Sequence, residues 1–77
     1  MIQIELRLFG SLRDQLGQGT KGKGNLSLSA QSKVSDALRA INIQQDVLVS
    51  IRDQEVRHDQ ELQEGDILFI FPPVAGG

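Results

Sequence analysis

The most apolar run of the chain reads Ile67-Leu68-Phe69-Ile70-Phe71, and two prolines follow it at positions 72 and 73. Five consecutive apolar residues of this kind are typical of a strand in the middle of a sheet, covered on both faces. Proline lacks a backbone N–H and has a fixed φ, so Pro72 and Pro73 end the pairing of this strand. The sequence therefore predicts a central strand over residues 67–71, after which the chain leaves the sheet.

Working outward from this run, other segments alternate between apolar and polar side chains as strands with one buried face do. The alternation is clear over residues 2–8 and 25–29, and further strands are expected over 47–51 and 55–57. Asp53-Gln54 is a plausible hairpin turn between the last two. A short helical turn is expected over 11–16, and Leu62 is expected to plug the core.

One segment has the periodicity of a helix. Ser32 is a good N-cap, and a helix is expected from Lys33 to about Asn42. Its apolar residues recur at i, i+3, i+4 and i+7, which makes a stripe that faces a core; they are Val34, Ala37, Leu38 and Ile41. The fold class predicted is α+β: a mixed sheet of about five strands with one main helix across one face, and with the first and last strands parallel neighbours in the middle.

Because one helix can cover only one face, alternate residues of the central strand should lie on an incompletely covered face. If Leu68 and Ile70 point into the core, Ile67, Phe69 and Phe71 point outward. Exposed phenylalanines indicate a protein–protein surface. The alternative is that a hairpin loop or a neighbouring strand folds over them.

Composition excludes several classes of function. The 77 residues suit one small domain, and 39% apolar content is too high for a disordered chain. The absence of Cys excludes disulfides and thiolate sites and fits a cytoplasmic protein. The start of the chain does not read as a signal peptide, and no apolar run approaches the roughly 20 residues of a membrane span. With a net charge of −2 and scattered basic residues, neither nucleic acid nor membrane is expected as a partner.

The glycine-rich segment 17–24 resembles a phosphate-binding loop in two registers, one of them with Gly17, Gly19 and Gly22 at G-x-G-x-x-G spacing. Both motifs need a strand before and a helix after, so that phosphates lie at the helix N-terminus. Here an alternating, strand-like segment follows, and Gly24 stands where a Ser or Thr would hold Mg²⁺. We therefore interpret the segment as a flexible hairpin connection.

The usual catalytic constellations are absent from the sequence. His58 is the only histidine and is expected to be a solvated surface residue beside Asp59. The acidic residues of segment 59–66 lack the spacing of a calcium loop, so we expect a solvated acidic turn and no metal site; they are Asp59, Glu61, Glu64 and Asp66. No serine has a base partner that can be argued. A self-contained enzyme is therefore not expected.

The chain ends in Pro72-Pro73-Val74-Ala75-Gly76-Gly77, which we expect to be a flexible tail on a domain of residues 1–71. Six extended residues reach at most about 20 Å, enough to enter another protein's active site. The terminal carboxylate is ionised and must be activated, for example as an acyl adenylate, before acyl chemistry. Glycine at the last two positions leaves room for the groups that would activate it. The alternatives are simple fraying or the remnant of a cut fusion.

The order of elements and three motifs resemble the β-grasp, ubiquitin-like sulfur carriers, above all the small subunits of molybdopterin synthase. The resemblance runs along the whole chain. Its specific motif is Phe71-Pro72-Pro73-Val74-Ala75-Gly76-Gly77, and two weaker motifs are Phe9-Gly10-Ser11-Leu12-Arg13-Asp14-Gln15-Leu16-Gly17 and Leu62-Gln63-Glu64-Gly65-Asp66. The fold that the resemblance implies is a β-grasp domain.

The resemblance also implies a function in two stages. A ubiquitin-activating-type adenylyltransferase would use ATP to adenylate the carboxylate of Gly77, and sulfur from a persulfide donor would convert it to a thiocarboxylate. The tail would then enter the large subunit of molybdopterin synthase, in a heterotetramer, and give its sulfur to a cyclic pyranopterin precursor. Gly76 would give clearance, the residues before it would thread the channel, and Phe69 and Phe71 would pack on the partner. The channel-threading residues are Pro72, Pro73, Val74 and Ala75. No cofactor bound to the chain itself is implied.

Three other readings stay open. Within the same class are the sulfur carrier for the thiazole of thiamine and a ubiquitin-like modifier that joins Gly77 to lysines of target proteins. From a different class, the chain would be a β-grasp binding module with an inert tail.

Overall fold

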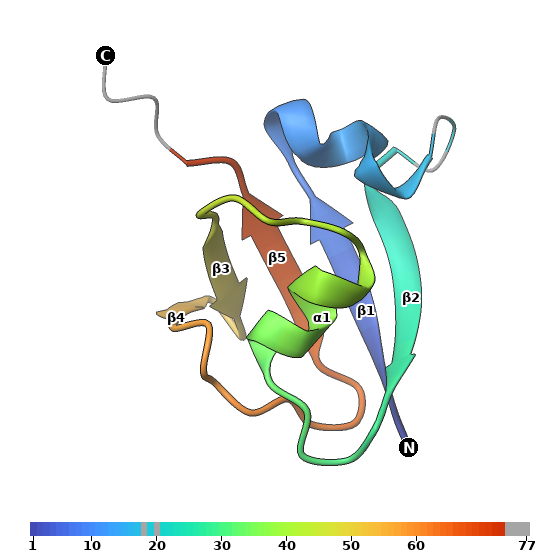
Figure 1. The fold of residues 1–77 in the computed structure, drawn as a ribbon, viewed down its shortest axis with the longest axis vertical. Helices are drawn as coiled ribbons and strands as arrows, with labels where there is room; N and C mark the ends of the chain where they lie inside the picture. Colours follow the sequence, from blue (N-terminus) through green and yellow to red (C-terminus); the bar gives the residue numbers. More distant parts are fainter. Residues whose placement is uncertain (18, 20, 74–77) are drawn as a thin grey trace.

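The sheet is built around β5 (Ile67–Phe71), as the apolar run predicts (Figure 1). The computed structural model describes residues 1–17, 19 and 21–73. Its sheet has five strands in the order β2-β1-β5-β3-β4, so two strands lie on each side of β5. The other elements are β1 (Ile2–Leu8), the 3₁₀ helix η1 (Gly10–Leu16), β2 (Lys23–Leu28), α1 (Val34–Ala40), β3 (Leu48–Ile51) and β4 (Gln54–Val56).

The first and last strands are parallel neighbours, which confirms the prediction from sequence. Glu5 pairs with Ile67 and Leu8 with Ile70, whereas β2 joins β1, and β3 joins β5, in antiparallel fashion. The sheet is therefore mixed. Because β1 and β5 run in the same direction, the end of β5 lies beside the start of η1, at the end of the sheet opposite the N-terminus (Figure 1).

A single core lies between the sheet and α1, which crosses one face (Figure 1). The expected helix stripe is buried, and so are Leu68 and Ile70 with no exposed surface at all. Leu62 is 1% exposed and plugs the core, as expected. The buried apolar residues are Ile4, Leu6, Leu8, Leu12, Val34, Ala37, Leu38, Ile41, Ile43, Val47, Val49, Ile51, Leu62, Leu68 and Ile70.

The start of α1 differs from the prediction by one residue. Lys33, with extended backbone, is the N-cap in place of Ser32. The Lys33 N–H donates to Oδ2 of Asp36 at 2.8 Å, so a side chain in the first turn satisfies the cap. Ser32 is instead tied to the chain before β5, because its carbonyl accepts from the Leu62 N–H at 2.8 Å. A tertiary contact has thus taken the place of the local cap. The helix also ends at Ala40, short of Asn42.

The hairpin between β3 and β4 turns at Arg52-Asp53, and the prediction of Asp53-Gln54 was wrong by one residue. Both turn residues have positive φ, 54° and 64°, which defines a two-residue loop of type I′. Ile51 pairs with Gln54 across it. This turn shape matches the twist of the strands, and that match prevails over the low preference of Arg for positive φ.

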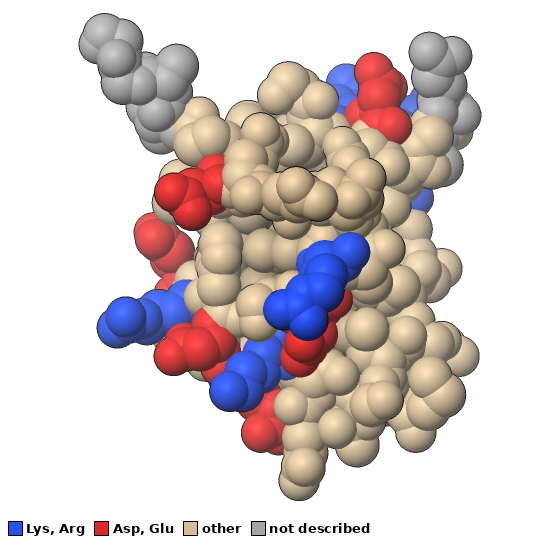
Figure 2. Space-filling model, in the orientation of Figure 1, with Lys and Arg blue, Asp and Glu red and all other residues tan. Residues whose placement is uncertain are grey.

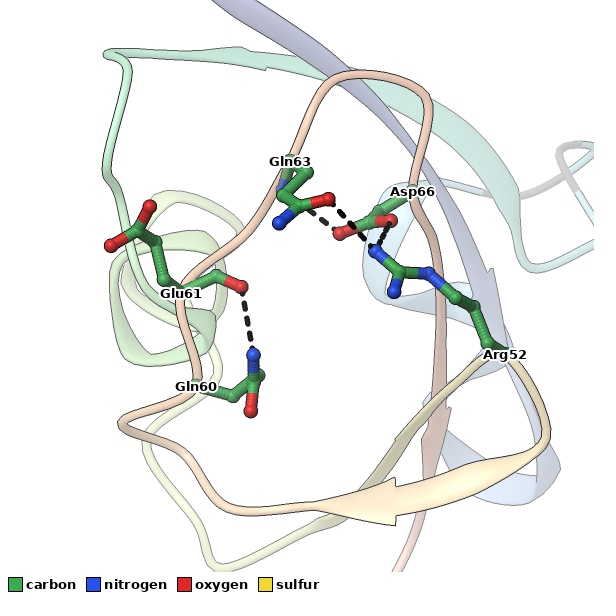
Figure 3. Close-up of polar contacts among 5 residues, drawn as sticks. All are labelled: Arg52, Gln60, Glu61, Gln63 and Asp66. Atoms are coloured by element: carbon green, nitrogen blue, oxygen red, sulfur yellow. Dashed lines mark hydrogen bonds and ion pairs between the residues drawn. The ribbon is translucent and has the colours of Figure 1, made fainter.

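The acidic turn before β5 is only partly solvated: Asp66 is 7% exposed, so the prediction needs correction at this residue. Figure 3 shows the polar contacts of Asp66. Its Oδ2 accepts from the Gln63 N–H at 2.8 Å, and its Oδ1 accepts from Arg52 Nη2 at 3.0 Å. The Arg52 Nη2 also donates to Oε1 of Gln63 at 3.1 Å. These bonds tie the β3–β4 hairpin to the turn that leads into the central strand.

His58 is likewise not a solvated surface residue. It is half-buried, and its Nε2 donates to the carbonyl oxygen of Val47 at 2.8 Å. Its own carbonyl accepts from the Ser35 N–H at 2.9 Å. The histidine therefore joins α1, the start of β3 and the segment after β4, and its role is structural.

The glycine-rich segment does not have the surroundings of a phosphate loop. The helix η1 precedes it and strand β2 follows it, whereas residues 18 and 20 lie outside the described part of the chain. Gly22 is buried, and its carbonyl accepts from the Leu8 N–H at 2.7 Å. Of the described helices, neither is long and apolar enough to cross a membrane.

Candidate functional site: an aromatic face and the exit of the tail

All three phenylalanines of the protein meet on the face of the sheet that α1 does not cover. The ring of Phe9 stacks on Phe71 with centroids 4.7 Å apart and on Phe69 with centroids 6.0 Å apart. Such pairs contribute about 0.5–1.5 kcal/mol each beyond the burial of their area. The stack therefore has a defined shape before any partner arrives.

Two aliphatic residues extend this surface. Leu48 lies beside Phe71 in the register of β3 and β5, and Ile67 precedes Phe69 on the same side of β5. Phe9, Phe71, Leu48 and Ile67 are 36–42% exposed, and Phe69 is half-buried. We call these five residues the aromatic face. With Met1 they include every large hydrophobic residue that is exposed in the described part of the chain. No loop or strand among the described residues covers this surface fully, contrary to the alternative raised from sequence.

The face that α1 covers has a different character. In Figure 2, which views that side, Lys and Arg side chains are interspersed with Asp and Glu, and no broad patch of one sign is visible. Among the described residues no three His, Asp or Glu side chains gather in a way that could hold a metal ion. The described residues thus offer a binding surface on the uncovered face and no group of side chains that could hold a metal ion.

The tail leaves the domain next to the aromatic face. Pro72, half-buried, lies against Gly10 at the start of η1, and Pro73 is exposed. A Cβ atom at position 10 would lie 2.9 Å from Pro72 Cγ, so the proline ring occupies the space that a side chain would need. The prolines therefore end the central strand as predicted, and the first of them is seated on the domain. Val74, Ala75, Gly76 and Gly77 lie outside the described residues.

Sequence reasoning found two of the three phenylalanines and missed Phe9. The signal was present, because Phe9 continues the odd-numbered, outward series of Gln3, Glu5 and Arg7 by one step. The Phe9 N–H donates to the Ile70 carbonyl at 3.1 Å, which extends the parallel pairing past the end of β1. Leu48 was missed because nothing in the sequence says that β3 lies next to β5.

We expect Gly10→Ala to disturb the base of the tail. Gly10 has φ of +60°, where a side chain costs about 1–2 kcal/mol, and the added methyl would also displace Pro72. Gly65→Ala is the matched control, because Gly65 has φ of +84° but no neighbour within 4 Å of an added Cβ. Urea unfolding should show a loss of stability in both variants. Amide NMR shifts of Phe71 should move only in Gly10→Ala, and equal shifts in both would contradict this contact.

The architecture defines a class of protein. A mixed five-stranded sheet with parallel first and last strands at its centre, and one helix across one face, is the β-grasp fold of ubiquitin-like proteins. The chain belongs to the ThiS family, whose family model matches residues 6–77, and it is a small β-grasp protein of the sulfur-carrier type. This match includes the segment 74–77. No curated protein sequence matches the chain.

Solved structures confirm the β-grasp fold over nearly the whole chain. A putative molybdopterin converting factor, subunit 1, from Pyrococcus furiosus has a TM-score of 0.78 at 20% identity, over 96% of this chain and all of that one. Small archaeal modifier protein 1 of Haloferax volcanii has a TM-score of 0.78 at 19% identity, over 96% and 100%. The Haloferax volcanii protein HVO 2177 has a TM-score of 0.78 at 25% identity, over 99% and 87%.

Proposed function

We propose that this protein carries sulfur as a thiocarboxylate on Gly77 and delivers it, within molybdopterin synthase, to a cyclic pyranopterin precursor. The observation that carries the proposal is the way the central strand ends: β5 passes from the aromatic face directly into the two prolines, and the family match continues through the two glycines. Binding surface and reacting end thus belong to one continuous segment of chain.

Loading would begin on the ATP-dependent adenylyltransferase. The Gly77 carboxylate attacks the α-phosphate of ATP, pyrophosphate leaves, and an acyl adenylate forms. The terminal sulfur of a persulfide donor then attacks the acyl carbon and displaces AMP. A thiol cleaves the S–S bond of the resulting acyl disulfide, which releases the thiocarboxylate and leaves the donor in a disulfide with that thiol. Because the step consumes ATP, we expect it to occur in the cytoplasm. The chain needs no bound cofactor for this, because its own contribution is the carboxylate and the room that Gly76 and Gly77 leave around it.

Delivery would use both parts of the site. The aromatic face packs on the large subunit of the synthase, in a heterotetramer. The segment from Pro72 to Gly77 enters the channel of that subunit. Six extended residues span at most about 20 Å, which limits how deep the segment can reach. The stacked rings cost little conformational entropy to bury, because each is already held by its neighbour. Fixing the base of the tail at Pro72 fixes the depth to which Gly77 reaches.

A second candidate is a ubiquitin-like modifier that is joined through Gly77 to lysines of other proteins. The likeness to small archaeal modifier protein 1 over the whole of that chain favours it. The thiazole carrier of thiamine synthesis is a third member of the same class. All three need the same adenylation. In both carriers sulfur then displaces AMP, and the two differ in the molecule that receives this sulfur, whereas in the modifier a lysine amine attacks the acyl carbon.

The test is the intact mass of the protein and of its C-terminal peptide after incubation with the activating enzyme, ATP, a persulfide donor and a thiol reductant. We expect one oxygen-to-sulfur exchange, confined to the peptide that contains Gly77. If no oxygen-to-sulfur exchange occurs when every component is present, the carrier proposal is wrong. Capture of the large synthase subunit by the thiocarboxylate form would then favour the pterin pathway, whereas isopeptide-linked lysines in the proteome would favour the modifier.

A further inference from the structure

On the uncovered face, the charge of the side chains changes sign from one edge of the sheet to the other. In the register of the strands, one row runs Lys23 on β2, Arg7 on β1, Phe69 on β5, Ser50 on β3 and Glu55 on β4. Leu26 and Leu28 of β2 and Val56 of β4 pack against the core, so Lys23 and Glu55 project from the uncovered face. The row is therefore basic at one edge, apolar in the middle and acidic at the other edge.

At the basic edge, one positive charge has no ion pair among the described residues. Arg7 donates to Oε2 of Glu5 at 2.9 Å, whereas no ion pair to Lys23 is found among the described residues. Lys23, Arg7, Glu5 and Asn25 line one shallow hollow at this edge. At the other edge Glu55 is exposed, and within residues that the structure describes it too has no ion-pair partner. Both ends of the row are open to a partner of opposite charge.

We infer that the aromatic face binds a second copy of this chain, about a two-fold axis that runs along β5. Two strands lie on each side of β5, so this rotation places β2 of one copy over β4 of the other. Lys23 of each copy then faces Glu55 of the other, and Phe9 faces Leu48. Phe69 and Phe71 meet their own counterparts on the axis. In this row the basic edge of each copy meets the acidic edge of the other, which a surface with one sign of charge could not achieve.

The twist of the sheet is compatible with this arrangement. A twisted sheet is saddle-shaped, and a two-fold axis along its central strand maps the saddle onto itself. The edges therefore stay as close as the centre. Packed sheets lie about 10 Å apart, a gap that the two phenylalanine layers fill and that a Lys and a Glu side chain can bridge at the rim.

The contact is small, and the dimer should be correspondingly weak. The contact is five strands wide, with strands about 4.8 Å apart, and three side-chain rows long. The area that each copy would bury is therefore below the value of about 800 Å² per partner that is usual in stable complexes. We expect association in the micromolar to millimolar range. The dimer would cover the face proposed to dock partner proteins, so the two would compete. The inference itself is independent of the sulfur-carrier proposal, because it concerns only the charges and the shape of this face.

Sedimentation velocity of the full chain, from about 1 µM to about 1 mM, tests the inference. We expect a reversible monomer–dimer equilibrium. Lys23→Glu and Glu55→Lys should each weaken it by about tenfold, because each reversal acts twice in a symmetric dimer. The double variant Lys23→Glu/Glu55→Lys restores both cross-pairs and should return the dissociation constant to within about threefold of the original.

Arg39→Glu is the matched control. It makes the same change of charge as Lys23→Glu, on an exposed residue of α1, which covers the opposite face. It should leave the equilibrium unchanged. A chain that stays monomeric to about 1 mM would overturn the inference and leave the face to partner proteins alone. The inference would also be overturned if neither single reversal changed the dissociation constant of the dimer, or if the double variant did not restore it.

Discussion

Deleting Gly77 is expected to abolish sulfur loading and delivery, with rates more than about 100-fold lower. The deletion withdraws the terminal carboxylate by up to about 3.5 Å. A displacement of about 1 Å from the reacting geometry can already cost about 100-fold. Binding to the large subunit should persist, because the aromatic face lies on β5, at Leu48 of β3 and at Phe9 after β1, which the deletion does not touch. Loading is followed by the mass of the C-terminal peptide, and binding by titration calorimetry.

Adding one glycine after Gly77 is the complementary variant. It moves the carboxylate by the same distance in the other direction and leaves two glycines at the tip. A carrier that depends on position should fail with both variants, while circular dichroism and partner binding stay unchanged. Full loading of the deletion variant would contradict a role for Gly77 and would leave the inert-tail binding module as the better reading.

The second large effect is expected at Leu68. Leu68→Ala should lower the free energy of unfolding by about 2–5 kcal/mol, because the side chain has no exposed surface and its removal leaves a cavity in the core. A domain of this size has a total stability of about 4–12 kcal/mol. The variant would therefore lose a large share of its stability. Since the chain has no Trp, urea unfolding is best followed by far-UV circular dichroism.

The neighbouring residue provides the control. Ile67→Ala removes an aliphatic side chain of similar size from the same strand, but from the uncovered face, where 36% of it is exposed. Its cost should be about 1 kcal/mol or less. Similar losses of unfolding free energy in the two variants would mean that both faces of β5 are equally covered, which would contradict the structure. The same comparison tests the aromatic face, because Ile67 belongs to it and Leu68 does not.

Much of the fold could be predicted because its signals are local. The alternation of residues 2–8, the helical spacing from Val34 to Ile41 and the unbroken apolar run of 67–71 each state which side chains must be buried. One helix and one fully apolar strand then force that strand into the middle of the sheet, with one face left uncovered. The outward direction of Phe69 and Phe71 follows from the same alternation.

Errors arose where a long-range contact replaced a local one. Asp66 looked like a solvated acid, yet Arg52 and the Gln63 N–H hold it in a buried turn. Ser32 looked like a cap, yet its carbonyl is used by Leu62. His58 looked exposed, yet it reaches Val47 across the loop before β3. Propensities describe the neighbours along the chain, whereas Val47, Arg52 and Leu62 are 11, 14 and 30 residues from the residues that they hold.

The amino-acid sequence alone determined the central strand, its proline exit and the glycine end that follows. Side-chain alternation and the missing N–H of proline act within a few residues and need no knowledge of the rest of the chain. Only the tertiary structure decided that Phe9 stacks on Phe71, that Pro72 lies against Gly10, and that Lys23 and Glu55 mark opposite edges of one row. Those relations depend on strand order and register, which are set by the packing of the whole core and by no single segment.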